Sequence, residues 1–175
     1  MRRLDIPTKH QMESVAHFAW MHKIENVVGQ GVEYAVMTPY TLVLASVETA
    51  GKTLQKILID FPSDMANEKA HESMFTTHEA VNHLTECYFA FEAHLKGEEH
   101  QWGSFVSTAT TFSDAVSELI QKRDHATKLL TQESDEATLT SALDYLVSHD
   151  WYHIGQLATN RQVFVPGWNS YALYS

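Results

Sequence analysis

The sequence predicts an all-α protein folded as a four-helix bundle. Among its 175 residues are only 7 glycines and 4 prolines, too few for the turns of an all-β protein. Hydrophobic residues make up 44% and charged residues 19%, which is typical of a chain with a buried core rather than a disordered one. Four long segments repeat apolar residues every three or four positions, as the helices of a bundle do.

The chain is expected to form one domain. We place the bundle at about residues 33–162, between an N-terminal extension (1–32) and an irregular tail (163–175). Residues 9–28 of the extension have the apolar spacing of an additional helix. The aromatic residues of the tail should either cover the bundle or meet a second subunit. They are Phe164, Trp168, Tyr171 and Tyr174.

The first helix of the bundle is predicted over residues 39–59. It should end near Pro62, because proline disfavours helical backbone in the residue before it. Its apolar stripe consists of Val43, Val47, Ala50, Leu54, Ile57 and Leu58.

The second helix is predicted to begin at a capping box. Thr76 is the N-cap, and Glu79 stands three residues later, so each side chain can accept a backbone N–H of the other. Gly97 is expected to end the helix. The apolar stripe between them consists of Ala80, Leu84, Cys87, Tyr88, Phe91 and Leu95.

The third helix is predicted to start near Ser113, after a long crossover (97–112). Four of the five residues 107–111 are serine or threonine, and these side chains favour caps and turns over helix interiors. The apolar positions of this helix are Val116, Leu119, Ile120, Ala126 and Leu130.

The fourth helix should open at residues 134–136, where acidic side chains complement the helix dipole, and run to about Arg161. Its inward stripe alternates spacings of three and four, as packing in a bundle requires. The stripe consists of Leu139, Ala142, Leu146, His149, His153, Gln156 and Asn160.

Charge and cysteine content exclude several function classes. A formal net charge of -10 repels the phosphate backbone, so no nucleic-acid partner is expected. No apolar run approaches the ~18 to 20 residues that span a bilayer, and no apolar segment of a secretory signal follows the charged start. Cys87 is the single cysteine, which excludes an internal disulfide and fits a reducing compartment. A cytoplasmic location, without a membrane partner, is therefore predicted.

The main chemical signal is a pair of histidines in the fourth helix, His149 and His153. Residues four apart lie on one helix face, so both imidazoles can reach a single ion. Both occupy stripe positions that otherwise hold Leu and Ala, and a buried polar ring needs a partner. A metal ion would be one partner. Separate hydrogen bonds are the alternative, since a chain with 11 histidines also produces such pairs by chance.

The second helix offers a third ligand, His83, two turns inside its capped end. His78 is the rival, but it lies in the first turn and on a different face. Catalytic zinc commonly has three protein ligands and keeps a fourth position for water or substrate. His83, His149 and His153 would form such a set.

These histidines stand in segments that resemble the DinB/YfiT-like family. Residues 149–157 resemble its H-x-x-x-H-x-G-Q-L signature, and residues 81–86 resemble its second-helix segment, in which a histidine before Leu or Ile is the first ligand. Segment order, helix count and length also agree over about residues 33–162.

The resemblance implies a bundle with an up-down-down-up arrangement. It also implies a divalent metal ion, commonly zinc or nickel, on the residues that match the family's ligands: His83, His149 and His153. Homodimers are frequent in the family, and a homodimer is expected here.

The family includes thiol-dependent S-transferases, a thiol-dependent isomerase, and proteins described as stress-induced or as metal-dependent hydrolases. A metal ion lowers the pKa of a bound thiol, and the thiolate is the nucleophile. We therefore predict a metal-dependent transferase that joins a low-molecular-weight thiol to an electrophile, in stress or detoxification. The alternatives are a hydrolase on the same ligands, a non-catalytic metal-binding dimer with a saturated ion, and a bundle whose histidines bind no ion.

Three residues are candidates for the substrate pocket: Gln156, Tyr145 and Asp150. Gln156 could instead orient His153, and Tyr145 could be ordinary core. Asp150 gives an H-D-x-x-H pattern close to the zincin motif H-E-x-x-H, but an interhelical hydrogen bond is the expected role. Cys87, four residues after His83, is expected to be a small buried hydrophobe rather than a ligand. Surface positions are expected for His10, His17, His22, His71 and His125.

Overall fold

Helix α2 (Pro39–Leu58) is the first element of the computed structural model, which describes residues 37–174. The Thr38 hydroxyl caps it by accepting the amide N–H of Thr41, and Pro39 stands at the start, where its missing N–H costs no hydrogen bond. All six residues of the predicted stripe are buried. The predicted extension and its helix (9–28) lie outside the described residues, and the single domain stays a prediction.

Helix α3 (Thr77–Leu95) confirms the predicted capping box, because both halves of it are formed between Thr76 and Glu79. The chain leaves the helix through Lys96 and reaches the left-handed region at Gly97, with φ of 71°. Glycine adopts that backbone without a steric penalty, so it ends the helix as predicted.

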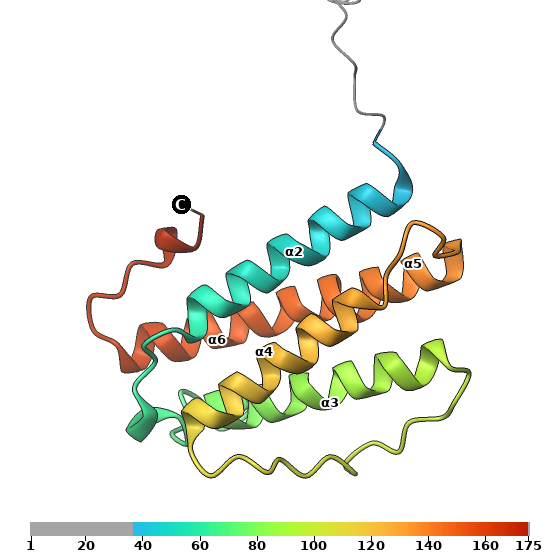
Figure 1. Cartoon of the computed structure of the whole chain (residues 1–175). Helices are drawn as coiled ribbons and strands as arrows, with labels where there is room; N and C mark the ends of the chain where they lie inside the picture. Colours follow the sequence, from blue (N-terminus) through green and yellow to red (C-terminus); the bar gives the residue numbers. More distant parts are fainter. Residues whose placement is uncertain (1–36, 175) are drawn as a thin grey trace, which may run out of the picture. The chain divides into compact units, whose positions relative to one another are not determined.

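Helix α4 (Phe112–Lys128) starts one residue earlier than Ser113, because the hydroxyl of Thr111 caps it by accepting the amide of Asp114. The predicted long crossover between α3 and α4 is present and contains no helix. Figure 1 shows this connection running back beside α3.

The predicted fourth helix is continuous but not uniform. It consists of α5 (Glu136–Leu143), a single π-helical turn η2 (Asp144–Ser148) and α6 (His149–Phe164). Five of the seven residues of the predicted inward stripe are buried, whereas His149 and Gln156 are half-buried. Asp150 stands four residues after Leu146 and three before His153, and it is fully buried as well. The buried residues therefore keep α-helical spacing through the π turn, but they continue onto the side of Asp150 rather than that of His149.

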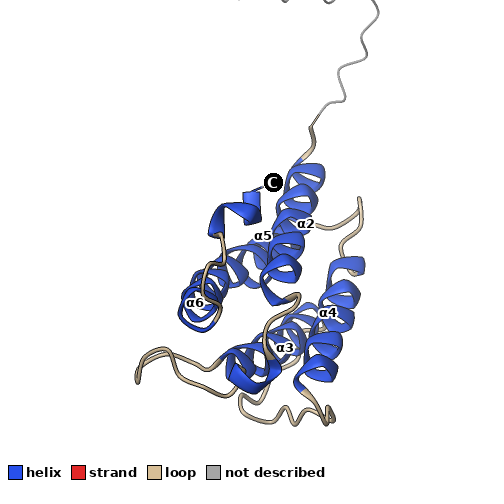
Figure 2. Cartoon of the chain, turned by 90° about the vertical axis from the view of Figure 1, so that its left-hand side faces the viewer, coloured by secondary structure: helices blue, strands red, loops and turns tan. Residues whose placement is uncertain are grey.

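The described residues thus contain four long helices, if α5, η2 and α6 are counted as one, and no strand. Helix α2 packs on α6 and α5, α3 packs on α4, and further contacts join α3 to α6 and α2 to α4 (Figures 1 and 2). The all-α fold is confirmed. The largest fully buried apolar side chains are Val47, Leu54, Ile57, Val81, Leu84, Tyr88, Phe91, Leu119, Leu146 and Leu157.

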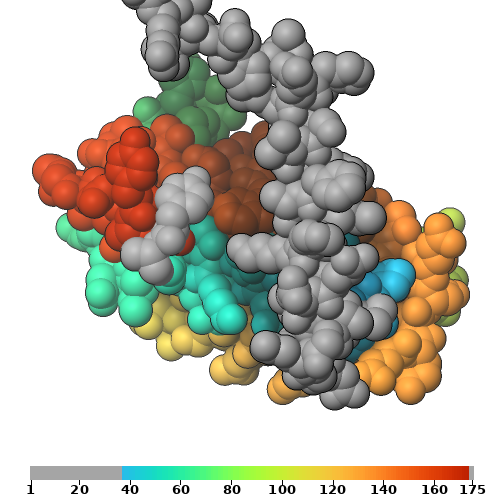
Figure 3. All heavy atoms as spheres, turned by 90° about the horizontal axis from the view of Figure 1, so that it is seen from above, coloured from blue at the N-terminus to red at the C-terminus, as the bar shows by residue number. Residues whose placement is uncertain are grey.

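The tail is shorter than predicted, because α6 continues to Phe164. Trp168 packs against the core, and its ring centre is 5.4 Å from the Arg161 guanidinium. The short helix η3 (Ser170–Tyr174) contacts α2, and Figure 3 shows the end of the chain beside that helix. The tail therefore covers part of the bundle. Between residues 37 and 174, no helix is long and apolar enough to cross a bilayer.

Candidate metal centre

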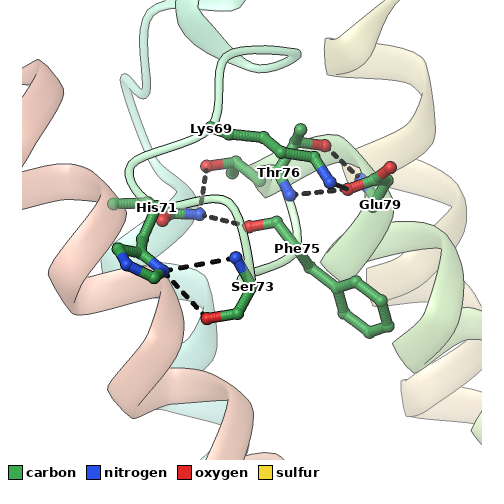
Figure 4. A network of polar contacts seen from close by, with 8 residues as sticks. Lys69, His71, Ser73, Phe75, Thr76 and Glu79 are labelled. Atoms are coloured by element: carbon green, nitrogen blue, oxygen red, sulfur yellow. Dashed lines mark hydrogen bonds and ion pairs between the residues drawn. The ribbon is translucent and has the colours of Figure 1, made fainter.

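The start of α3 is fixed by polar contacts that also reach α6 (Figure 4). The Thr76 amide donates to the Glu79 carboxylate at 2.8 Å, and the Glu79 amide donates to the Thr76 hydroxyl at 3.0 Å. The side chain of Asn160, in α6, donates to the Phe75 carbonyl at 3.1 Å. Because His83 lies two turns into α3, these contacts set its position along α6.

Four side chains converge between the two helices: His83 and Cys87 from α3, and His149 and His153 from α6. The possible ligand atoms of His83, Cys87 and His149 all lie within 4.8 Å of one another, so these three residues could hold a metal ion. The Cys87 sulfur is 3.7 Å from Nε2 of His83 and 3.9 Å from Nε2 of His149. Nε2 of His153 is 3.2 Å from Nε2 of His149, which places it beside this group.

The separations of three atom pairs are close to those of tetrahedral coordination, but His153 is not among the residues whose ligand atoms all lie within 4.8 Å of one another. With bonds from zinc of about 2.05 Å to nitrogen and about 2.3 Å to sulfur, tetrahedral angles place two nitrogens about 3.3 Å apart and a nitrogen and a sulfur about 3.6 Å apart. The observed nitrogen pair is 3.2 Å apart, and the two sulfur–nitrogen distances are 3.7 and 3.9 Å. Imidazole and thiolate together are a donor set that zinc prefers.

A hydrogen bond fixes the proton of His153. Its Nδ1 is 2.9 Å from Oε1 of Gln156, and the amide nitrogen of Gln156 donates to the Tyr152 hydroxyl at 3.0 Å. An amide oxygen only accepts, so Nδ1 carries the proton and Nε2 of the neutral ring keeps a lone pair. Metal-binding histidines commonly have this outer hydrogen bond, which sets both the tautomer and the ring orientation.

The contact between Nε2 of His149 and Nε2 of His153 has two interpretations. It is a hydrogen bond if His149 carries its proton on Nε2, or a pair of lone pairs directed at one ion if it does not. Nδ1 of His149 is buried and has no hydrogen-bond partner among the described residues. The first interpretation satisfies His153 and leaves this Nδ1 as an unused acceptor. The second directs the lone pairs of both rings at one ion but makes this Nδ1 a donor without an acceptor.

Burial keeps the imidazoles neutral. Desolvation, with a smaller effect of neighbouring histidines, lowers the pKa of His149 and of His153 to about 4 each. Desolvation also lowers the pKa of His83, although Glu86 opposes the shift. At neutral pH all three rings are therefore in the form that binds metal ions.

Burial has the opposite consequence for the thiol. It raises the pKa of Cys87 to about 12, and the negative charges of Glu86 and Asp150 add to the effect. The side chain is therefore a thiol unless a positive charge stands next to it. A divalent cation between the histidines would be such a charge and would favour the thiolate.

The cluster is partly open to solvent. Cys87 and His153 are each 2% exposed, but His83 and His149 are only half-buried. Aromatic rings border it: the ring of Phe75 lies 5.4 Å from that of His83, and the ring of Trp102 lies 6.4 Å from it. A small molecule that approaches His83 would therefore meet apolar side chains.

Glu86 holds the crossover beside the cluster. Its Oε1 accepts the Gly103 amide at 2.6 Å and lies 3.2 Å from Nε2 of His100. Gly103 has φ of 80°, a left-handed conformation that favours glycine. These contacts flank Trp102 on both sides in the sequence and hold it near His83.

The three predicted pocket residues lie in different surroundings. Gln156 is at the cluster and orients His153, the second of the two roles considered for it. Asp150 is 0% exposed and forms interhelical hydrogen bonds with Tyr88 and Arg123, as expected of it, so its carboxylate faces no pocket. Tyr145 packs against Phe91 and His94, nearer the C-terminal end of α3 than His83 is.

The other histidines of the described region stay outside the cluster. The rival His78 points away, with Nδ1 3.1 Å from Oδ1 of Asn67 and its ring against Phe112. His71 and His125 are exposed, as predicted. The predictions for His10, His17 and His22 fall outside the described residues.

Two residues of the site region were missed by sequence reasoning. Cys87 was assigned to the core and is buried there, but its sulfur faces His83 and His149. Arg123 was assigned no role, although it is 4% exposed. A signal existed, because Arg123 stands four residues after Leu119 and three before Ala126, within the apolar stripe of α4.

Comparisons with protein-family models, curated proteins and solved structures found no match to this chain.

Proposed function

We propose that this chain binds one divalent metal ion, zinc or nickel, through His83, His149 and His153, with the sulfur of Cys87 close enough to serve as a fourth ligand. The observation that carries the proposal is the convergence of these side chains: His83, Cys87 and His149 offer ligand atoms within 4.8 Å of one another, and Nε2 of His153 lies 3.2 Å from Nε2 of His149. The hydrogen bond from His153 to Gln156 supports it, since it leaves the lone pair of His153 on the side of the cluster.

The fold proposed to carry this site is a DinB-like bundle with the helices arranged up-down-down-up. The long connection between α3 and α4 supports this arrangement, because two neighbouring helices that run in the same direction need a connection as long as a helix.

The chemistry that we propose for the ion is transfer of a low-molecular-weight thiol. A divalent ion lowers the pKa of a thiol that binds it. The thiol would release its proton to solvent, its sulfur would bond to an electrophilic carbon, and the leaving group would depart with the electrons of the carbon bond that breaks. The half-buried His83 and the apolar border of Phe75 and Trp102 support access for a small, partly apolar substrate.

Two other functions use the same ligands. A hydrolase would activate water in place of a thiol and would need no added thiol for turnover. A non-catalytic metal protein would keep four protein ligands on the ion, as structural zinc sites do. The position of Cys87 specifically favours this third function, because a thiolate and three imidazoles leave no tetrahedral position for substrate. A homodimer and a cytoplasmic location remain predictions.

The first experiment is elemental analysis of the purified, untagged protein. We expect about one zinc or nickel per chain, lost in His153→Ala and kept in His71→Ala. His71 is the matched control, because its ring is exposed and its Nδ1 forms hydrogen bonds with Ser73, outside the cluster. Circular dichroism should show that both variants remain helical.

The absence of stoichiometric metal, even after reconstitution, would refute the proposal, as would a full equivalent in folded His153→Ala. If metal is found, product formation with and without added thiol distinguishes transfer from hydrolysis. No turnover with either class of substrate would favour the non-catalytic function.

A further inference from the structure

We infer that a buried network of Tyr88, Asp150 and Arg123 positions His149 for metal binding, although none of the three is a ligand. The inference rests on the proposed function, because it concerns how well the same site is formed. It assigns a role to the most deeply buried charged groups of the bundle, which the proposed chemistry does not use.

The network consists of four short hydrogen bonds. The Tyr88 hydroxyl donates to Oδ1 of Asp150 at 2.7 Å, and Nε of Arg123 donates to Oδ2 at 2.8 Å. Nη2 of Arg123 donates to the Val47 carbonyl at 2.7 Å and to the Leu146 carbonyl at 3.0 Å. Tyr88, Asp150 and Arg123 are 0%, 0% and 4% exposed, so solvent does not compete for these bonds.

Two residues of the network are sequence neighbours of candidate ligands. Tyr88 follows Cys87 in α3, and Asp150 follows His149 in α6. A bond between the Tyr88 hydroxyl and the Asp150 carboxylate therefore fixes the two helices to each other one residue away from the cluster. A shift of α6 that separated His149 from Cys87 would also break this bond.

Helical spacing brings Asp150 to the network. It stands four residues after Leu146 and three before His153, which are both buried, so its side chain faces the core. The π turn η2 ends at Ser148, directly before His149, and contains Leu146, whose carbonyl accepts from Arg123. Arg123 therefore binds both the π turn and Asp150.

Helix α2 leaves room for Arg123. A Cβ atom at Gly51 would overlap Nη1 of Arg123, so any other residue at this position would push the guanidinium aside. Through Gly51 and Val47 the network contacts α2 as well as α3, α4 and α6. A buried ion pair is often no more stabilising than apolar side chains of the same size. We therefore assign the pair of Arg123 and Asp150 the role of fixing the register between the helices, rather than that of stabilising the fold.

A positioning role and a structural role make different predictions. A residue that only stabilises the fold changes the free energy of unfolding but not the affinity of the folded protein for metal. A residue that positions His149 also changes the affinity of the folded protein and the ligand field of the bound ion. Metal affinity at a temperature where every variant is folded therefore separates the two roles.

The test compares full-length wild type with Tyr88→Phe, which removes one hydroxyl from the network. Zinc affinity is measured by competition with a chelator, and the visible spectrum is recorded after substitution with Co²⁺. We expect zinc binding to weaken roughly 10-fold to 100-fold, with a shifted Co²⁺ spectrum. The control is Arg161→Lys in α6, the helix of His149, because Arg161 is also buried but donates to the Ile57 and Ile59 carbonyls. It should lower thermal stability and leave zinc affinity unchanged.

A second variant, Gly51→Ala, keeps the inference testable if Tyr88→Phe does not fold. Alanine favours helix more than glycine does, but its Cβ should displace Arg123 and weaken zinc binding. Unchanged zinc affinity in a folded Tyr88→Phe or Gly51→Ala protein would overturn the inference while the metal site stood. An equal loss of affinity in Arg161→Lys would also overturn it. If wild type binds no zinc, the proposed function fails and the inference falls with it.

Discussion

Among single residues, Cys87 has the largest consequence for what the site can do. Three imidazoles alone leave a tetrahedral ion with one position for a thiol or water. A thiolate from Cys87 would occupy that position, so turnover would require a ligand to leave. The side chain is almost fully buried, and its sulfur already faces two of the histidines. The balance between a catalytic and a structural ion therefore depends on this one residue.

Replacing Cys87 with alanine tests the coordination directly. In the Co²⁺-substituted wild type we expect a near-ultraviolet band from sulfur-to-metal charge transfer, and in Cys87→Ala we expect that band to vanish. The variant should still bind about one Co²⁺ through the three histidines, but more weakly. A wild-type Co²⁺ spectrum without the sulfur band would show that Cys87 is not a ligand.

The buried histidines also predict how metal-free protein responds to acid. The pKa of His149 and of His153 is about 4 in the folded protein, below the ordinary value of 6.5. Between these values the unfolded chain takes up protons that the folded chain does not, so acid favours unfolding. The free energy of unfolding should be highest above about pH 6.5 and should fall as the pH drops toward 4.

Urea denaturation at pH 7.5 and pH 5, with a chelator present, measures this effect. His153→Gln should reduce the loss of stability on acidification, whereas His71→Gln, at an exposed position, should not. A metal-free protein as stable at pH 5 as at pH 7.5 would contradict the prediction.

At the scale of elements, the sequence contains clear local signals for the helix ends and none for the π turn. The capping box at Thr76, Gly97 after α3 and Pro62 after α2 are local signals, so they can be recognised without tertiary information. The π turn has no comparable signal in the sequence. Its Leu146 carbonyl accepts from Arg123 of α4, a contact between helices that only the folded structure shows.

Removing the cap of α3 should affect both stability and the site. Thr76→Ala leaves the Glu79 amide without its side-chain acceptor and should cost about 1 kcal/mol of stability. Because the cap fixes the first turns of α3, zinc affinity should also fall. The matched control is Thr38→Ala at the exposed start of α2, which should cost a similar amount and leave zinc affinity unchanged. Equal affinities in the two variants would contradict this account.

The candidate site was predictable in part, because helical spacing is a local property of the sequence. The pair His149 and His153 follows from helical spacing, and His83 from the family resemblance and its place in α3. Cys87 and Arg123 could not be assigned from spacing alone. A buried cysteine has the same periodicity as an apolar residue, and a buried arginine is recognised only when its partners from other helices are known.

For the whole molecule, an ion between α3 and α6 would join two halves of the bundle, since α3 packs mainly on α4 and α6 mainly on α2. Binding to the folded state alone should therefore stabilise the entire protein. At a free zinc concentration 100 times the dissociation constant, the gain is about 2.7 kcal/mol. Thermal unfolding with zinc and with a chelator measures it. An unchanged midpoint would mean that no ion binds the folded protein selectively.

The hydrogen bonds between Glu86 and the crossover provide a way to follow metal binding. They hold the indole of Trp102 near His83, whereas the other described tryptophans, Trp151 and Trp168, belong to α6 and the tail. A cation on His83 would alter the electric field at that indole, so its light emission should change as zinc is added. Trp102→Phe should abolish the change. The fluorescence of Trp102 should therefore report how much of the metal site is occupied, in real time and without an added label.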